Sequence, residues 1–363
     1  MNNFDKCLEK CHINFDKNID DLIDIYIKTQ NLRNKNKIIT NLISTVNKRI
    51  IVLSTYFNLT KNKYIKNNLI NFYNNLKKQG VLLYVAELSL DTEFELDESC
   101  CDKLYQIKKK NYMWYKESLL NFLLDKIPKS CEIVCWIDAD IIFENDFWAI
   151  ELYYKRKKFN VFQLFQNVIR CNNKPLEYYK KNPNIKKYTG YVYKYLNKIN
   201  TTDIIPGYAW AIKTDIIKEM KFYDKCILGG GDTILINSFM KTNIKNFYFE
   251  NESYIKDIKK YKDKMYKLVN KKISNLNGCI YHLYHGNYNN RNYGNRYLIY
   301  KMIKFDPNLH LKRHNDYFYN WNYSDDFIIK INKMIHQYMK IKSDNKINDK
   351  LKQKLIEAVL DKS

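Results

Sequence analysis

The sequence contains no apolar stretch that approaches the roughly 20 residues needed for a membrane-spanning helix. Its first residues, Met1 to Lys6, also lack the apolar segment of a secretory signal. From these two absences we expect a soluble, cytoplasmic protein without a transmembrane segment.

Cysteine patterns typical of zinc sites are also missing. The chain has 9 cysteines, an odd number, and two pairs are spaced four residues apart, Cys7/Cys11 and Cys131/Cys135. Neither pair is accompanied by a second cysteine or histidine pair at zinc-site spacing. We interpret the cysteines as reduced thiols of a cytosolic protein, with Cys131 and Cys135 in the core on one face of a strand.

Glycine is scarce, at 9 of 363 residues, and none lies in the segment 56–60 that follows the first expected strand. A nucleotidyltransferase, which also uses aspartates and metal on a similar sheet, would carry a glycine-rich and basic phosphate loop at this point. The absence of that loop argues against the nucleotidyltransferase class, which is kept as the second enzymatic interpretation.

The charge is strongly one-sided, with a formal net charge of +23. The lysines are spread along the chain, and lysine, asparagine, isoleucine and tyrosine are all encoded by AT-rich codons. An AT-rich source, such as a large DNA virus or a low-GC microbe, therefore accounts for much of the excess. We expect a general attraction for polyanions but no specific nucleic-acid partner. A basic, non-catalytic binding module remains an alternative, and it predicts steeply salt-dependent binding.

Apolar runs and helical periodicity alternate along the chain, which predicts an α/β fold with a mostly parallel sheet flanked by helices. We expect strands at 50–55, 81–86, 133–137, 159–165 and 279–285, and helices at 61–78, 111–125, from about 146, 251–277, 325–342 and 346–361. The first strand, helix and strand predict parallel strands joined by a right-handed crossover. Residues 89–102 and 171–200 are expected to be loops. The predicted organisation is a helical extension at 1–45, one domain at 46–325 and C-terminal helices at 326–363.

Two aspartates, Asp138 and Asp140, follow directly after the buried strand 133–137. The carboxyl end of a buried strand is where open α/β sheets bind ligands. On an extended chain the two side chains leave the same face, so that they could hold one divalent cation that grips a nucleotide diphosphate. The alternative is that the triplet is only a polar strand end.

Two later stretches carry further polar candidates. Three glycines precede Asp232, and the apolar run after it is helical in pattern, so Asp232 lies near a helix amino terminus, either as a cap or facing an acceptor hydroxyl. His285 stands before a glycine at the end of an alternating strand, either as a metal ligand or as a hydrogen-bonded bystander.

Four segments in this order resemble the metal-dependent GT-A glycosyltransferases. These are Trp-Tyr-Lys-Glu-Ser-Leu-Leu-Asn at 114–121, the Asp-x-Asp segment Trp-Ile-Asp-Ala-Asp-Ile-Ile-Phe-Glu-Asn at 136–145, Pro-Gly-Tyr-Ala-Trp-Ala-Ile at 206–212 with Gly-Gly-Gly-Asp-Thr at 229–233, and His-Gly-Asn at 285–287. The resemblance covers residues 48 to 325. It implies a GT-A (Rossmann-like) fold and transfer of a hexosyl or N-acetylhexosaminyl group from a UDP- or GDP-sugar to a glycan, protein or lipid.

Residue roles follow from the resemblance. Asp140 and His285 would ligate Mn²⁺ or Mg²⁺, and Asp138 would contact the metal or the ribose, because oxygen ligands with one imidazole suit these ions better than zinc. Ser54, Thr55 and Glu87 would face the nucleoside, with Lys116 and Asn121 nearby. Asp232 would be the general base of an inverting transfer, whereas a retaining enzyme is the alternative. Tyr208, Trp210, Gly230 and Gly231 would lie on the acceptor side, and Tyr208, Trp210 and Trp321 would offer rings on which a sugar could stack.

Overall fold

The computed structural model describes residues 49–59, 61–90, 93–241, 251–286, 299–300, 303–313, 317–322 and 325–343. The helices expected within 1–45 and at 346–361 lie outside these residues. Among the helices that are described, none has the length and apolar character that a bilayer crossing demands.

A seven-stranded sheet forms the centre of the molecule, and it confirms the mixed α/β fold with a mostly parallel sheet. Its order is β11 (Ile273–Asn275), β6 (Val161–Gln163), β10 (Ala209–Lys213), β4 (Ile133–Ile137), β1 (Ile50–Tyr56), β2 (Leu82–Leu90) and β3 (Lys103–Lys109). Only β10 runs antiparallel to its neighbours, β4 and β6, among these strands. The predicted parallel pairing of the first two strands is therefore confirmed.

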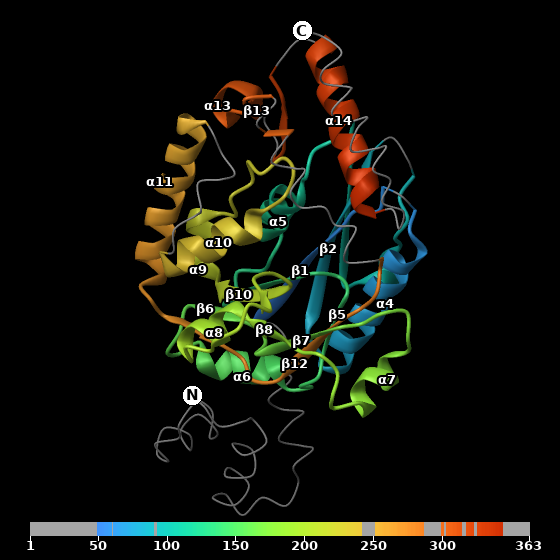
Figure 1. Ribbon diagram of the computed structural model, residues 1–363, viewed down its shortest axis with the longest axis vertical. Coiled ribbons are helices and arrows are strands. Elements are labelled where there is room, and N and C mark those ends of the chain that lie inside the picture. The colour runs from blue at the N-terminus through green and yellow to red at the C-terminus, as the bar shows by residue number, and fades with distance from the viewer. Residues whose placement is uncertain are drawn as a thin grey trace, which may run out of the picture.

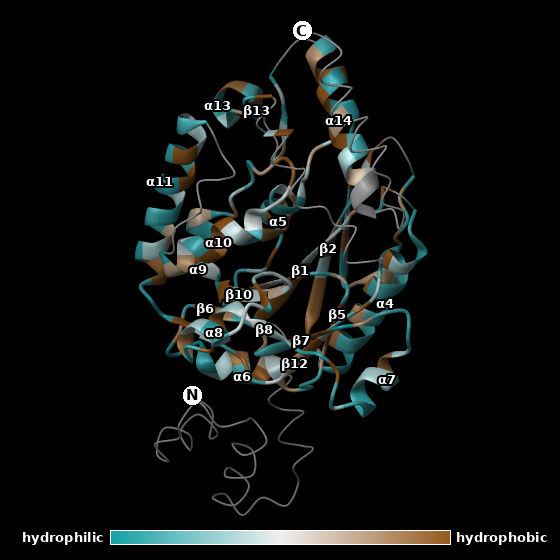
Figure 2. Ribbon diagram, viewed as in Figure 1, coloured by the Kyte–Doolittle hydropathy of each residue, from teal (hydrophilic) through white to brown (hydrophobic). Residues whose placement is uncertain are grey.

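Helices cover both faces of this sheet, as the alternation along β1 requires. Ile51 and Leu53 pack into one buried cluster, whereas Ile50 and Val52 pack into another. The first cluster is closed by α5 (Lys116–Leu124), α9 (Thr214–Met220), α10 (Gly231–Met240), α11 (Glu252–Val269) and α14 (Asp325–Ser343), and the second by α4 (Lys63–Lys78) and α6 (Trp148–Lys155). Figure 1 shows α9, α10 and α11 grouped on the side of the sheet away from α4. In Figure 2, α11 is largely hydrophilic outside while β2 is hydrophobic.

A second, smaller sheet lies next to the carboxyl end of β4. Its order is β5 (Ile141–Phe143), β12 (Cys279–His282), β7 (Asn167–Arg170), β8 (Tyr188–Gly190) and β9 (Ile204–Ile205). β12 pairs antiparallel with β5, so that His282 stands opposite Ile141. Because β5 begins directly after Asp140, this pairing carries the late histidine segment to the aspartates.

Several local predictions were wrong. The segment 89–102 is not only a loop, because β2 extends to Leu90 and η1 (Glu98–Cys100) leads into β3, a partly exposed edge strand that carries three lysines. The segment 171–200 is not a loop either, since it contains α7 (Leu176–Lys181), β8 and α8 (Tyr191–Leu196). Short elements of this kind bury few side chains and leave little periodicity in the sequence. The remaining short elements are α13 (Pro307–His310), β13 (Leu311–Arg313) and β14 (Tyr319–Trp321).

The cysteines that the structure describes are buried and not joined in disulfides, which agrees with the prediction of reduced thiols. Burial raises the pKa of the Cys135 thiol well above its ordinary value. Cys131 and Cys135 both lie in the core, but in different clusters. The prediction that they share one strand face was wrong because β4 begins only at Ile133.

Candidate functional site

The two aspartates lie on the turn between β4 and β5, where the chain leaves the central sheet. The turn is fixed from both sides: the Asp138 N–H donates to the Tyr208 carbonyl at 2.8 Å, and the Ser54 hydroxyl donates to the Ile137 carbonyl at 2.8 Å. Residues 139 and 140 form a turn, so the continuous extended backbone expected for the two aspartates is not present. Each carboxylate instead has its own set of partners.

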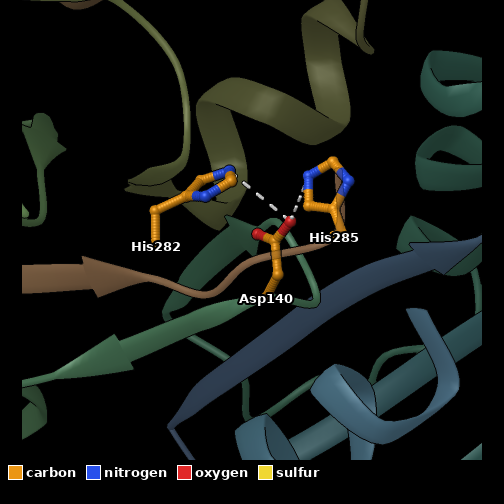
Figure 3. A group of neighbouring side chains, drawn as sticks. All are labelled: Asp140, His282 and His285. Carbon is orange, nitrogen blue, oxygen red and sulfur yellow. Dashed lines mark ion pairs between the residues drawn. The ribbon is translucent and has the colours of Figure 1, made fainter. Parts of the chain in front are cut away.

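Asp140 lies between two imidazoles. Its Oδ2 is 3.1 Å from Nε2 of His285 and 3.5 Å from Nε2 of His282, and one ligand atom from each of the three residues lies within 4.8 Å of the others. Figure 3 shows the two rings approaching the carboxylate from opposite sides. The structure therefore brings together Asp140 and His285, which the sequence selected, and adds His282, which it did not.

The backbone explains how the chain forms this group. His282 is the last residue of β12, and the next residue, Leu283, donates its N–H to the Asp140 carbonyl at 2.8 Å. The His282 ring is almost fully buried and lies 4.4 Å from the Tyr208 ring, centroid to centroid. The spacing His-Leu-Tyr-His was a signal for His282, because two imidazoles three residues apart can meet where a strand ends.

The donor set fits a divalent cation of the Mn²⁺ type. One carboxylate oxygen and two imidazole nitrogens are on hand, and this mixed set suits Mn²⁺ better than Mg²⁺ or Ca²⁺, which favour oxygen alone. Three protein ligands on one side leave further coordination positions for the oxygens of a ligand. Asp138 is not part of this group.

Asp138 instead belongs to a second charged group with Lys116 and Asp232. The Lys116 ammonium lies 2.8 Å from Asp138 Oδ1 and 3.5 Å from Asp232 Oδ2. Burial opposes the charge on Lys116, but the neighbouring carboxylates of Asp138 and Asp232 outweigh it and raise the pKa of this lysine. Lys116 therefore remains a cation that pairs with two carboxylates from distant parts of the chain.

Asp232 sits in the first turn of α10 and does not cap it. The N-cap is Gly230, with φ 106°, and no side chain makes a capping bond there. About a third of the Asp232 side chain is exposed, and its Oδ2 would be 3.2 Å from a Cβ on Gly207. The capping alternative is thus not what the structure shows, and the carboxylate remains accessible to an incoming group.

Glu117 is a buried carboxyl group that the sequence analysis did not select. It follows Lys116 on α5, is 3% exposed, and has no hydrogen-bond partner for Oε2 among the described residues. Burial and the Asp232 charge raise the pKa of Glu117 to about 8, against the opposing effect of Lys116. Glu117 is therefore largely protonated at neutral pH.

Three of the residues expected to bind the donor have structural roles instead. Ser54 is buried on the Ile137 carbonyl. Glu87 accepts hydrogen bonds from the N–H groups of Glu95 and Leu96 and from the Gln106 amide. Asn121 exchanges two hydrogen bonds with the backbone of Phe222. These three side chains are buried, whereas Thr55 and Lys116 keep partly exposed surface.

On the acceptor side, two expected aromatic platforms are core residues. Trp210 is buried, donates its indole N–H to the Pro206 carbonyl and stacks on Trp136, and Trp321 is buried against α14. Both stacking predictions were wrong because the ring faces are covered. Gly231 is buried as well, whereas Tyr208 and Gly230 are partly exposed.

No protein-family model and no curated protein matches the sequence. Among solved structures, similarity is found to glucosyl-3-phosphoglycerate synthase from Mycobacterium tuberculosis in complex with Mn²⁺, UDP and phosphoglyceric acid (11% identity, 85% of this chain and 84% of that chain, TM-score 0.37). Staphylococcus aureus TarS 1–349 is similar at 11% identity over 86% of this chain and 81% of that chain, with a TM-score of 0.36. A Drosophila galactosyltransferase 7 mutant with manganese, UDP-Gal and xylobiose is similar at 12% identity over 54% of this chain and 66% of that chain, with a TM-score of 0.30. At such low similarity, the function has to be inferred from the site.

Proposed function

We propose that the protein is a GT-A-type glycosyltransferase that moves a sugar from a nucleoside-diphosphate sugar, a UDP- or GDP-sugar, to an acceptor hydroxyl with the help of Mn²⁺. The observation that carries the proposal is the convergence of Asp140, His282 and His285 beside β4, next to the group of Lys116, Asp138 and Asp232. Residues 46–325 would form the catalytic domain.

Asp140, His282 and His285 would hold the cation, and Asp138 would contact the ribose. When bound, the cation would supply the positive charge that a departing diphosphate needs. Lys116 places an ammonium between Asp138 and Asp232 that offsets part of their negative charge, so the bound cation would supply most of the positive charge that a diphosphate meets.

Asp232 is the proposed general base, which would accept the proton of the acceptor hydroxyl as that oxygen attacks the anomeric carbon. Its carboxylate is partly exposed in the first turn of α10, and Gly207 leaves room for it at close range. A base at this position fits a single displacement with inversion, and we propose that stereochemistry over retention.

The proposal is tested by a thermal-shift panel of nucleotide-sugars with and without Mn²⁺, on the wild-type chain and on Asp140→Ala. One donor should raise the melting temperature only when Mn²⁺ is present, through mass action on the folded state. Asp140→Ala should abolish the Mn²⁺-dependent part. A donor shift that is equal in EDTA, or unchanged in the variant, would remove the metal role.

A further inference from the structure

The segment that carries His285 lies beyond the last hydrogen-bonded strand residue. β12 ends at His282, and residues 283–285 have left the ladder. Leu283 is held by the Asp140 carbonyl, as described above, but this bond lies two residues before His285. An imidazole on an unsupported backbone would lose conformational freedom on binding an ion, and this loss weakens binding. Some other element has to fix this segment.

Helix α4 supplies that support through two amide side chains. Asn62 Nδ2 donates to the His285 carbonyl at 2.8 Å, and Asn68 Nδ2 donates to the Tyr284 carbonyl at 3.1 Å. The ring of Tyr64 contacts the ring of Tyr284 edge-on, with centroids 5.3 Å apart. Consecutive carbonyls of the histidine segment are therefore bound from one helix, more than 200 residues earlier in the chain.

Asn62 has a second function in the same place. It is the N-cap of α4, and its Oδ1 accepts from the Tyr64 N–H at 3.0 Å while its Nδ2 reaches His285. One amide thus uses its acceptor for the helix and its donor for the histidine segment. A residue chosen only for capping would not need the donor, because serine and aspartate cap equally well.

We propose that Asn62 and Asn68 are positioning residues for the metal-binding histidine His285, so that α4 forms part of the support of the metal site. The inference rests on the metal role proposed above for His285. Outer partners that orient a metal ligand typically change metal affinity 10- to 100-fold when removed. For Asn62, which acts through the backbone, we expect about the lower of these values.

The test is a titration of the full-length chain with Mn²⁺ alone, followed by the loss of the free-ion electron paramagnetic resonance signal. Asn62→Ser keeps a capping oxygen but removes the amide donor, and it should weaken Mn²⁺ binding about tenfold. Asn251→Ser is the matched control, because Asn251 caps α11 through the Tyr254 N–H and has no contact with the site in the described residues. It should leave Mn²⁺ affinity unchanged, and both variants should keep near wild-type melting temperatures in chelator.

Asn68→Ser removes the other donor and gives an independent measurement if Asn62→Ser fails to fold. Equal Mn²⁺ affinity of wild type, Asn62→Ser and Asn68→Ser would overturn the positioning role while leaving the metal site intact. Absence of Mn²⁺ binding by the wild type would overturn the metal role and, with it, this inference. A loss of affinity in Asn251→Ser as large as in Asn62→Ser would show a stability effect and also overturn the positioning role.

Discussion

At the scale of single residues, the site depends on which charged side chains form ion pairs and which carboxyl group stays protonated. Lys116 lies between Asp138 and Asp232, and Glu117 beside them is buried with a raised pKa. One ammonium therefore serves two carboxylates, and a third carboxyl group is kept neutral by its surroundings. Charge balance of this kind depends on contacts among distant residues, so the sequence could supply Asp232 and Lys116 as candidates but not their pairing.

Glu117→Gln should make the protein more stable at neutral pH. The pKa of Glu117 is about 8 in the folded chain, against an ordinary glutamate value of 4.5, so the unfolded state loses its proton first as pH rises. The stabilisation linked to the bound proton is complete below about pH 4.5 and is lost between there and about pH 8. At pH 7 the wild type should be less stable than the glutamine variant by roughly 3 kcal/mol. Urea unfolding at pH 4 to 8 measures the difference, and parallel curves for the two proteins would contradict it.

Asp232→Asn should cut sugar transfer by two or more orders of magnitude, because an amide cannot accept the acceptor proton. Donor binding with Mn²⁺, measured by calorimetry, should remain near the wild-type value since Asp232 is not among the metal ligands. Asp215→Asn, on the first turn of α9, is a matched control that removes an aspartate elsewhere in the chain. Unaltered turnover in Asp232→Asn would exclude Asp232 as the base.

At the scale of elements, α5 and α10 meet at a contact that leaves no room for a side chain on Gly231. A Cβ there would lie 2.1 Å from Glu117 Oε1, well inside van der Waals contact. The Asn121 side chain on α5 exchanges two hydrogen bonds with the Phe222 backbone, and the Trp114 N–H, just before α5, donates to the Ile227 carbonyl. Together these contacts fix the amino terminus of α10, and therefore the position of Asp232.

Gly231→Ala should destabilise the protein by about 1–3 kcal/mol, although alanine is otherwise the better helix former. The double variant Gly231→Ala/Glu117→Ala should recover part of this loss, since the smaller side chain vacates the space. Thermal unfolding of the two single variants and the double variant gives the coupling directly. Additive losses would show that the contact does not carry the effect.

Much of the fold was predictable at this scale because long apolar or periodic segments determine the large elements. β1, β4, α4, α6 and α14 were expected close to where they lie. β3, β5 and β7 were missed because short or charged strands are stabilised by their neighbours rather than by their own pattern. His282 was missed for a related reason, since its role follows from the pairing of β12 with β5.

At the scale of the whole molecule, the net charge of +23 is a long-range property distinct from the site. At low salt the protein should therefore bind any polyanion, and this binding should weaken steeply as the salt concentration rises. Asp140→Ala should leave this binding unchanged, whereas it should abolish Mn²⁺-dependent donor binding. Fluorescence anisotropy with a random DNA duplex at several salt concentrations measures the first effect. A duplex of one sequence that is bound far more tightly than the random duplex would favour the non-catalytic binding module instead.

Tyr208 links the two halves of the site through a backbone shape that L-amino acids avoid. Its φ is 81°, its carbonyl accepts from the Asp138 N–H, and its ring lies against His282. A glycine at this position would relax a strain on the order of 1 kcal/mol but remove the ring. Backbone stability and the ring contact with His282 are therefore opposed at this one position. Selection for stability alone would favour glycine here, at the expense of the residue that joins the two charged groups.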